Sequence, residues 1–142
     1  MSRMTRQQAV AALADGVRAD LGAAGAILGL LERQFEAALR HQADALTCLA
    51  AELTPALDAM EARRQQRVTL VRALLGADGS MAGFIAAQAE PARASLAAAW
   101  TDLEALVVRC KAATLRNTNL LAEQFSVMQR VLHGEDQTYA PR

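Results

Sequence analysis

One stretch decides the fold of this chain, VAALADGVRADLGAAGAILGLLERQFEAAL at residues 10–39. Its apolar residues recur about every 3.6 positions, the period of a helix that buries one face. These residues are Val10, Leu13, Val17, Leu21, Ala24, Leu28, Leu31, Phe35 and Leu39. The charged residues Asp15, Arg18, Arg33, Glu36 and Arg40 fall on the opposite side. We therefore expect an amphipathic helix over roughly residues 5–40.

Four glycines interrupt this helical pattern, at Gly16, Gly22, Gly25 and Gly29. Each glycine inside a helix destabilises it by about 1 kcal/mol relative to alanine. The glycines either let another helix approach closely or mark a looser, bendable stretch. We favour the close approach.

A second apolar stripe predicts a helix over residues 44–75. Asp44 is placed as its N-cap or first-turn acid, and Gly76 as its C-terminal stop. Pro55 lies within the pattern, so we expect either a kink there or a restart with Thr54 as the cap. The stripe consists of Leu46, Leu49, Leu53, Leu57, Met60, Val68, Val71 and Leu75, with Arg64 where an apolar residue is due.

Two further helices are expected after the turn at residues 76–80. Ser80 could cap a short helix over residues 80–88, and Pro91 suits the first position of a last helix over residues 91–133. Gly134 is expected to end that helix, leaving residues 134–142 as a mobile tail. The last stripe consists of Leu96, Trp100, Leu103, Val107, Cys110, Thr114, Leu121, Phe125, Met128 and Leu132.

The composition supports the same fold class. Among 142 residues there are 33 alanines and 20 leucines, the strongest apolar helix formers, but only 8 valines and 2 isoleucines. The predicted fold is all-α: a single domain over residues 1–142, built as an elongated antiparallel bundle of three long helices plus one short helix. The first two helices are expected to be antiparallel and joined near residues 41–44.

Charge and hydropathy exclude several classes of function. Fifteen basic residues balance fifteen acidic ones, so no overall field attracts nucleic acid or an anionic membrane. The longest uncharged runs have eleven residues, whereas a membrane span needs roughly 20. No signal peptide is visible, and Cys48 and Cys110 are isolated thiols rather than a disulfide framework. A cytosolic protein is expected.

Residues for catalysis or for metal and cofactor binding are not grouped in the sequence. His41 and Cys48 share a face but lie about 10 Å apart along a helix axis, too far for one ion. No phosphate-binding glycine loop and no nucleophile–base pair is present. We therefore expect no enzyme, no cofactor and no metal. Arg63, Arg64 and Arg67 form a basic cluster that is either a docking surface or, as we favour, a solvated face.

Two stretches carry a resemblance to a known family. They are LTPALDAMEARRQQRVTLVRALLG at residues 53–76 and LRNTNLLAEQFSVMQRVLHG at residues 115–134, the latter followed by TYAPR. Together with Trp100 near the start of the last helix, they resemble the FlgN family, the cytosolic export chaperones of the bacterial flagellar type III system. The resemblance covers the full length of the chain.

The resemblance implies a function and a set of contacts. FlgN-type chaperones bind the C-terminal segments of the hook-filament junction proteins FlgK and FlgL, prevent their premature assembly, and deliver them to the export gate. We expect Leu121, Phe125 and Met128 to line the partner surface on the last helix, with Asn117 and Asn119 at its polar edge. By the same resemblance, Tyr139 is expected to dock to the export-gate protein FlhA, against the alternative of a silent tail residue.

Two alternatives stay open at this point. The polar residues Thr114, Asn117 and Thr118 belong either to a groove that tolerates water or to a buried network or solvent-facing turn. The whole chain could also be a structural coiled-coil or bundle adaptor with no export role, although the 3.6-residue period argues against a long left-handed coil.

Overall fold

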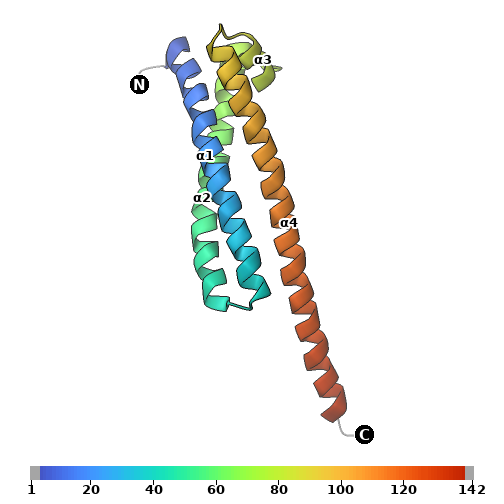
Figure 1. Ribbon diagram of the computed structural model, residues 1–142. Coiled ribbons are helices and arrows are strands. Elements are labelled where there is room, and N and C mark those ends of the chain that lie inside the picture. Colours follow the sequence, from blue (N-terminus) through green and yellow to red (C-terminus); the bar gives the residue numbers. More distant parts are fainter. Residues whose placement is uncertain (1–3, 140–142) are drawn as a thin grey trace.

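The computed structural model describes residues 4–139, with side chains described up to Gly134, and consists of four helices in that range. They are α1 (Arg6–Leu39), α2 (Ala43–Leu75), α3 (Met81–Ala86) and α4 (Ala92–Tyr139). The three long helices have 34, 33 and 48 residues and lie alongside one another, so the molecule is elongated (Figure 1). The prediction of an all-α bundle with three long helices and one short helix is confirmed.

Local signals set both ends of α1. Thr5 accepts a hydrogen bond from the Gln8 N–H, and the Gln8 side chain accepts one from the Thr5 N–H, which completes a capping box. At the other end His41 adopts a left-handed conformation with φ of 53°. Its N–H donates to the Ala38 carbonyl, and the Gln42 N–H donates to the Ala37 carbonyl. This bonding pattern is a Schellman motif, and it turns the chain back into α2.

The predicted signals in α2 and α3 act as helix caps and stops. Asp44 lies in the first turn of α2, and Gly76 ends α2 with φ of 90°, a conformation that favours glycine. The helix runs through Pro55 without a restart, and the Thr54 hydroxyl donates to the Ala50 carbonyl instead of capping. Ser80 caps α3 by accepting a hydrogen bond from the Gly83 N–H.

Helix α1 is the centre of the bundle. It packs closely against α2 and against α4, whereas the backbones of α2 and α4 do not approach each other closely. Phe84 and Ile85 of α3 join the core at the end of the bundle near Gly76 (Figure 1). The first core cluster consists of Leu13, Val17, Ala24, Val71, Phe84, Ile85, Leu96 and Leu103, and the second of Ile27, Leu30, Leu31, Ala37, Leu49, Leu53 and Ala113. Helix α3 contacts both α2 and α4 at one end of the bundle, but along the rest of their length only α1 lies between them, so one side between α2 and α4 stays open.

Three expectations about glycine and proline were wrong. A Cβ atom added at Gly16, Gly22, Gly25 or Gly29 would meet nothing within 4 Å, so these glycines do not permit a close helix approach. Helix α4 does not end at Gly134 but continues to Tyr139, because a glycine stops a helix only where it leaves the helical conformation, as Gly76 does. Pro91 is the residue before α4 rather than its first residue. The last three residues of the expected tail lie outside the described residues.

Candidate partner-binding surface

A buried acidic residue holds α1, α2 and α4 together near the middle of the bundle. The Asp20 side chain is 0% exposed, and its carboxylate accepts hydrogen bonds from Arg63 Nε and, at 2.6 Å, from Arg67 Nη1. The Arg67 guanidinium also lies over the Trp100 ring of α4, 5.3 Å from its centroid. Arg63 and Arg67 are therefore not a solvated face, because their charges pair with Asp20 inside the fold. Only Arg64 of the predicted basic cluster faces outward, where it pairs with Glu61 at 2.7 Å.

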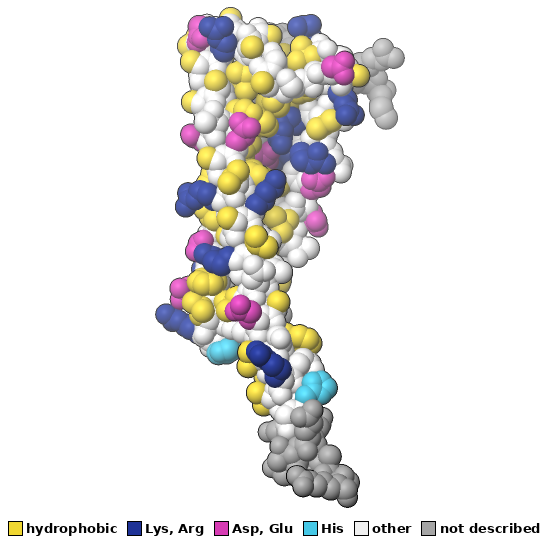
Figure 2. All heavy atoms as spheres, turned by 90° about the vertical axis from the view of Figure 1, so that its right-hand side faces the viewer, with side chains coloured by type: hydrophobic (Ala, Val, Ile, Leu, Met, Phe, Trp, Pro, Cys, Tyr) yellow, Lys and Arg dark blue, Asp and Glu magenta, His cyan; other side chains and the backbone are white. Residues whose placement is uncertain are grey.

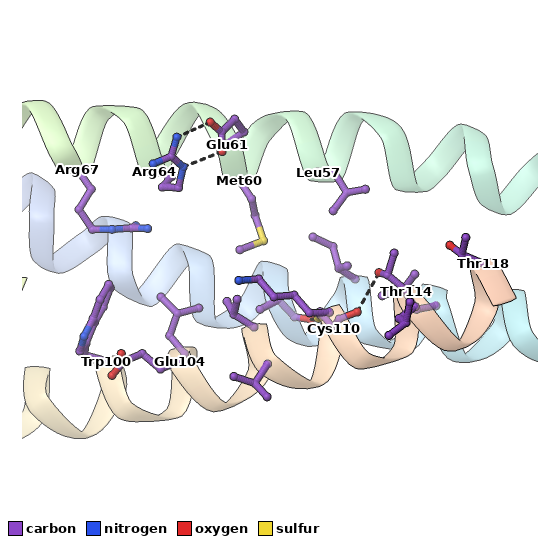
Figure 3. A pocket seen from close by; sticks show the side chains of 18 residues that line it. Leu57, Met60, Glu61, Arg64, Arg67, Trp100, Glu104, Cys110, Thr114 and Thr118 are labelled. Carbon is purple, nitrogen blue, oxygen red and sulfur yellow. Dashed lines mark hydrogen bonds and ion pairs between the residues drawn. The ribbon is translucent and has the colours of Figure 1, made fainter.

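Beside this contact lies a groove of about 820 Å³ between α2 and α4, with α1 as its floor (Figure 3). Its walls carry exposed apolar side chains, among them Leu57 of α2 and Val108 and Leu115 of α4. We call this surface the groove; it is lined by Ala24, Ile27, Leu31, Leu57, Met60, Glu61, Arg64, Arg67, Trp100, Leu103, Glu104, Val107, Val108, Cys110, Lys111, Thr114, Leu115 and Thr118.

The groove is lined by charged groups of both signs, and one of them, Arg67, pairs with the buried Asp20. Hydrogen bonds from Arg64 lower the pKa of Glu61 to about 2, so this carboxylate is ionised throughout the physiological range. Glu104 and Lys111 add one charge of each sign on the α4 side. Burial raises the pKa of the Cys110 thiol, which donates a hydrogen bond to the Ala24 carbonyl at 3.4 Å and is thus a structural group rather than a nucleophile.

Asn117 fixes the C-terminal half of α4 to α1 by hydrogen bonds. Its side chain is 2% exposed, and its Nδ2 donates to the Leu31 carbonyl and to Gln34 Oε1, both at 2.8 Å. Its Oδ1 accepts from the Arg116 guanidinium at 3.1 Å. Of the two readings for the polar patch, the buried network holds for Asn117, whereas Thr114 and Thr118 are exposed and line the groove. Asn117 therefore points into the bundle and not to the edge of an exposed surface.

The last part of α4 projects past the turn that joins α1 and α2 (Figure 1). Gln124 still donates a hydrogen bond to the Ala38 carbonyl at 2.8 Å. Around and after it the apolar side chains are exposed, with Phe125 at 66% and Met128 at 58%. Hydrophobic side chains run down this side of the molecule and reach the projecting segment (Figure 2). We call Leu121, Phe125, Met128 and Leu132 the C-terminal stripe; Val127 and Val131 are also exposed.

The groove and the C-terminal stripe are two parts of one face of α4. In the groove, the α4 residues Trp100, Glu104, Val107, Lys111, Thr114 and Thr118 follow one another in alternating steps of four and three residues. The same alternation leads directly to Leu121, Phe125, Met128 and Leu132. Residues three and four apart are neighbours on a helix surface. These α4 residues therefore form one continuous surface. Its first part lies beside α1 and α2, whereas its last part projects past them.

A comparison with models of protein families shows to which family the chain belongs. The model of the FlgN protein family matches residues 1–134, almost the whole chain. This protein belongs to the FlgN family. No curated protein and no solved structure matches the chain. Membership of the FlgN family suggests a chaperone of flagellar export, and FlgN is a family of chaperones rather than of enzymes.

The described part of this FlgN-family protein contains no group of three or more His, Cys, Asp or Glu side chains that could hold a metal ion. No helix between residues 4 and 139 is long and apolar enough to cross a membrane. What the described residues offer instead is apolar surface on helices. Such a surface is suited to recognising an amphipathic helix.

The residues predicted to line the partner surface of this FlgN-family protein differ in exposure. Asn119, Leu121, Phe125 and Met128 are exposed, as a partner surface requires, whereas Asn117 is not. The groove was missed, although Val108 and Leu115 gave a signal: they are large apolar residues seven apart that fall off the buried stripe. The side chain of Tyr139 lies outside the described side chains, although the backbone there is helical.

Proposed function

We propose that this protein is a flagellar export chaperone that binds the C-terminal helical segments of the hook-filament junction proteins FlgK and FlgL. The observation that carries the proposal is the C-terminal stripe. Four large apolar side chains stand on one face of α4, and they are between 37% and 66% exposed. Exposed apolar patches of this kind mark sites of protein binding.

The stripe suits a helical client. Phe125 and Met128 are the most exposed members and offer an aromatic anchor beside a flexible thioether, which can adapt to more than one client. Leu121 extends the apolar surface, and Asn119 is exposed directly after Thr118, where the groove ends. A client helix that buries its apolar face here could not use that face to assemble with other client molecules.

The described network at Asn117 supports this role indirectly. Asn117 and Gln124 tie α4 to α1 just before and within the stripe, so the helix that presents the stripe is fixed to the bundle. A fixed helix loses little conformational freedom when it binds its client. We assign Asn117 a positioning role for the client surface.

Delivery completes the proposed cycle. The protein works in the cytoplasm and hands its client to the export-gate protein FlhA, with Tyr139 as the docking residue. An aromatic residue gives a large contact area with few torsions to fix, which suits a small docking contact.

A peptide titration tests the client proposal. Peptides with the C-terminal sequences of FlgK and FlgL are titrated into the full chain, with scrambled peptides of the same composition as controls. We expect saturable binding of the native sequences, loss of binding in Met128→Glu, and unchanged binding in Val127→Glu. Val127 is the matched control because it is also half exposed but points away from the stripe. If neither native peptide binds, the chain is a structural adaptor and not a chaperone for these clients.

A further inference from the structure

The groove and the C-terminal stripe lie along one line of α4 residues, which we call the α4 line; it runs from Trp100 to Leu132. We propose that one client helix follows this line: it lies on the C-terminal stripe and continues into the groove, as a fourth long helix of the bundle. The inference rests on the proposed function, because its occupant is the client. It adds the groove to the client site, and it assigns the client helix an acidic and a basic residue about two turns apart.

The α4 line has the spacing that a second long helix needs. Its residues alternate in steps of four and three, which places two of them in every seven. A helix that packs along such a line crosses at a shallow angle and stays in contact over many turns. On the facing wall of the groove, Leu57, Met60 and Arg64 of α2 follow in steps of three and four (Figure 3). Both walls are therefore suited to one helix between them.

Helix α1 leaves room for the client helix beside it. Asn117 and Gln124 of α4 donate hydrogen bonds to α1, so these two side chains mark the direction in which α1 lies. Thr118 and Phe125 of the α4 line directly follow them, and adjacent residues lie about 100° apart around a helix. A helix packed on the line is therefore a neighbour of α1, as in a four-helix bundle, and does not take its place.

The walls of the groove favour a helical occupant over an extended one. They are formed by α1, α2 and α4, whose backbone groups bond within each helix. An extended chain buried there would leave its own backbone N–H and C=O groups without partners, which is costly. A helix satisfies these groups internally. It also offers an apolar face to Leu57, Val108 and Leu115, which are at least half exposed in the chain alone.

The charges of the groove define the polar residues of the client helix. Arg64 and Arg67 already pair with acidic residues of the fold. Glu104 and Lys111 also line the groove, but they form no ion pair in the part of the chain that the structure describes. They lie seven residues apart, about 10 Å along α4. A client helix pairs with both when it carries a basic and an acidic residue at the same separation on one face.

The length of the α4 line sets the length of the client helix. From Trp100 to Leu132 the line extends about 48 Å at 1.5 Å per residue, whereas the stripe alone extends about 17 Å. A client that contacts the whole line must therefore be helical over about 30 residues.

The fluorescence of Trp100 tests whether the client enters the groove. Trp100 is the sole tryptophan of the chain, lines the groove and is partly exposed. The full chain is titrated with a peptide of about 35 residues that has the C-terminal sequence of FlgK or FlgL, long enough to follow the whole line, with any tryptophan replaced by phenylalanine. We expect the Trp100 emission to shift to shorter wavelength and its quenching by acrylamide to fall, along the same binding curve as the anisotropy of the labelled peptide.

The outcomes separate this inference from the proposed function. Binding to the stripe alone leaves Trp100 unchanged, because Leu121, the nearest stripe residue, is about 30 Å away along the helix. Peptide binding with unchanged Trp100 therefore overturns the inference and leaves the chaperone proposal standing. Absence of any binding overturns both. Protection of Trp100 that grows with the concentration of the chain alone would put a second copy in the groove and overturn the inference as well.

Two matched pairs of variants then test the contacts with the same peptide. Leu115→Glu should raise the peptide dissociation constant at least about tenfold, whereas Val127→Glu, at a similarly exposed position off the α4 line, should leave it unchanged. Glu104→Lys should raise the constant about threefold at low salt and have no effect at high salt. Its control is Glu123→Lys, the same charge change at an exposed position on the opposite side of α4. Equal effects within either pair overturn the inference.

Discussion

The two halves of α4 share one pattern but have different neighbours. Between Ala92 and Gln124 the helix lies on α1, and Leu103 is 3% exposed. After Gln124 the same spacing continues, yet Leu132 is 48% exposed. The difference comes from the lengths of the other helices: α1 ends at Leu39 and α2 begins at Ala43, so their turn leaves the end of α4 without support. Amphipathic spacing therefore identifies a face that can be buried, but not whether anything covers it.

The largest expected effect is on the free energy of unfolding, and it compares one leucine in each half of α4. Leu103→Ala should lower the free energy of unfolding by about 3 kcal/mol, because it opens a cavity in a packed core. Leu132→Ala should lower it by less than about 0.5 kcal/mol, since this side chain is already half in water. Urea unfolding of both variants gives the comparison. Similar losses at the two positions would mean that the projecting half is covered.

The second prediction concerns the buried Asp20 carboxylate, which links α1 to α2 beside the N-terminal half of α4. Asp20→Asn removes the negative charge between Arg63 and Arg67 and should cost about 2 kcal/mol, less than for a fully buried pair because Arg63 is partly exposed. It should also change the fluorescence of Trp100, since Arg67 lies over its ring. Stability and fluorescence both equal to those of the wild type would show that this contact does not hold the helices together.

The sequence predicts a residue's role well when that role depends only on residues adjacent in the chain. The caps at Ser80 and Gly76 were predicted because each depends on a few adjacent residues. The partners of Asp20 were not, because Arg63 and Arg67 are more than forty residues away and the pattern gives no sign of which helices meet. Asp20 does lie on the buried face of α1, three residues after Val17 and four before Ala24, and an acidic residue at such a position is a signal for a buried partner. The spacing does separate Asn117 from exposed Asn119, because Asn117 falls three residues after Thr114 and four before Leu121, on the apolar side of the last helix.

The third prediction tests the boundary between the two halves. Asn117→Ala leaves the Leu31 carbonyl and Gln34 without their partner and should cost about 1.5 kcal/mol. Asn119→Ala is the control and should change stability by less than about 0.5 kcal/mol, because Asn119 is exposed. Client peptides should bind more weakly to Asn117→Ala if its role is to position the stripe. Unchanged client binding in a less stable variant would limit Asn117 to the fold.

The smallest expected effect on stability lies at the far end of α4. Tyr139→Ala should change the free energy of unfolding by less than about 0.5 kcal/mol and leave client affinity unchanged. The same variant, loaded with client, should bind the soluble domain of FlhA more weakly than wild type. Equal affinities for the export-gate domain would leave Tyr139 with no docking role.

The central claim is that the projecting half of α4 is a binding surface and the supported half is core. The most direct test measures two quantities on dilute Phe125→Ala protein: the melting temperature and the affinity for a FlgK or FlgL C-terminal peptide. We predict nearly unchanged melting and client binding weaker by about 1 to 3 kcal/mol, as for a truncated anchor residue. A sharp fall in melting temperature with unchanged affinity per folded molecule would contradict the account, because Phe125 would then belong to the core.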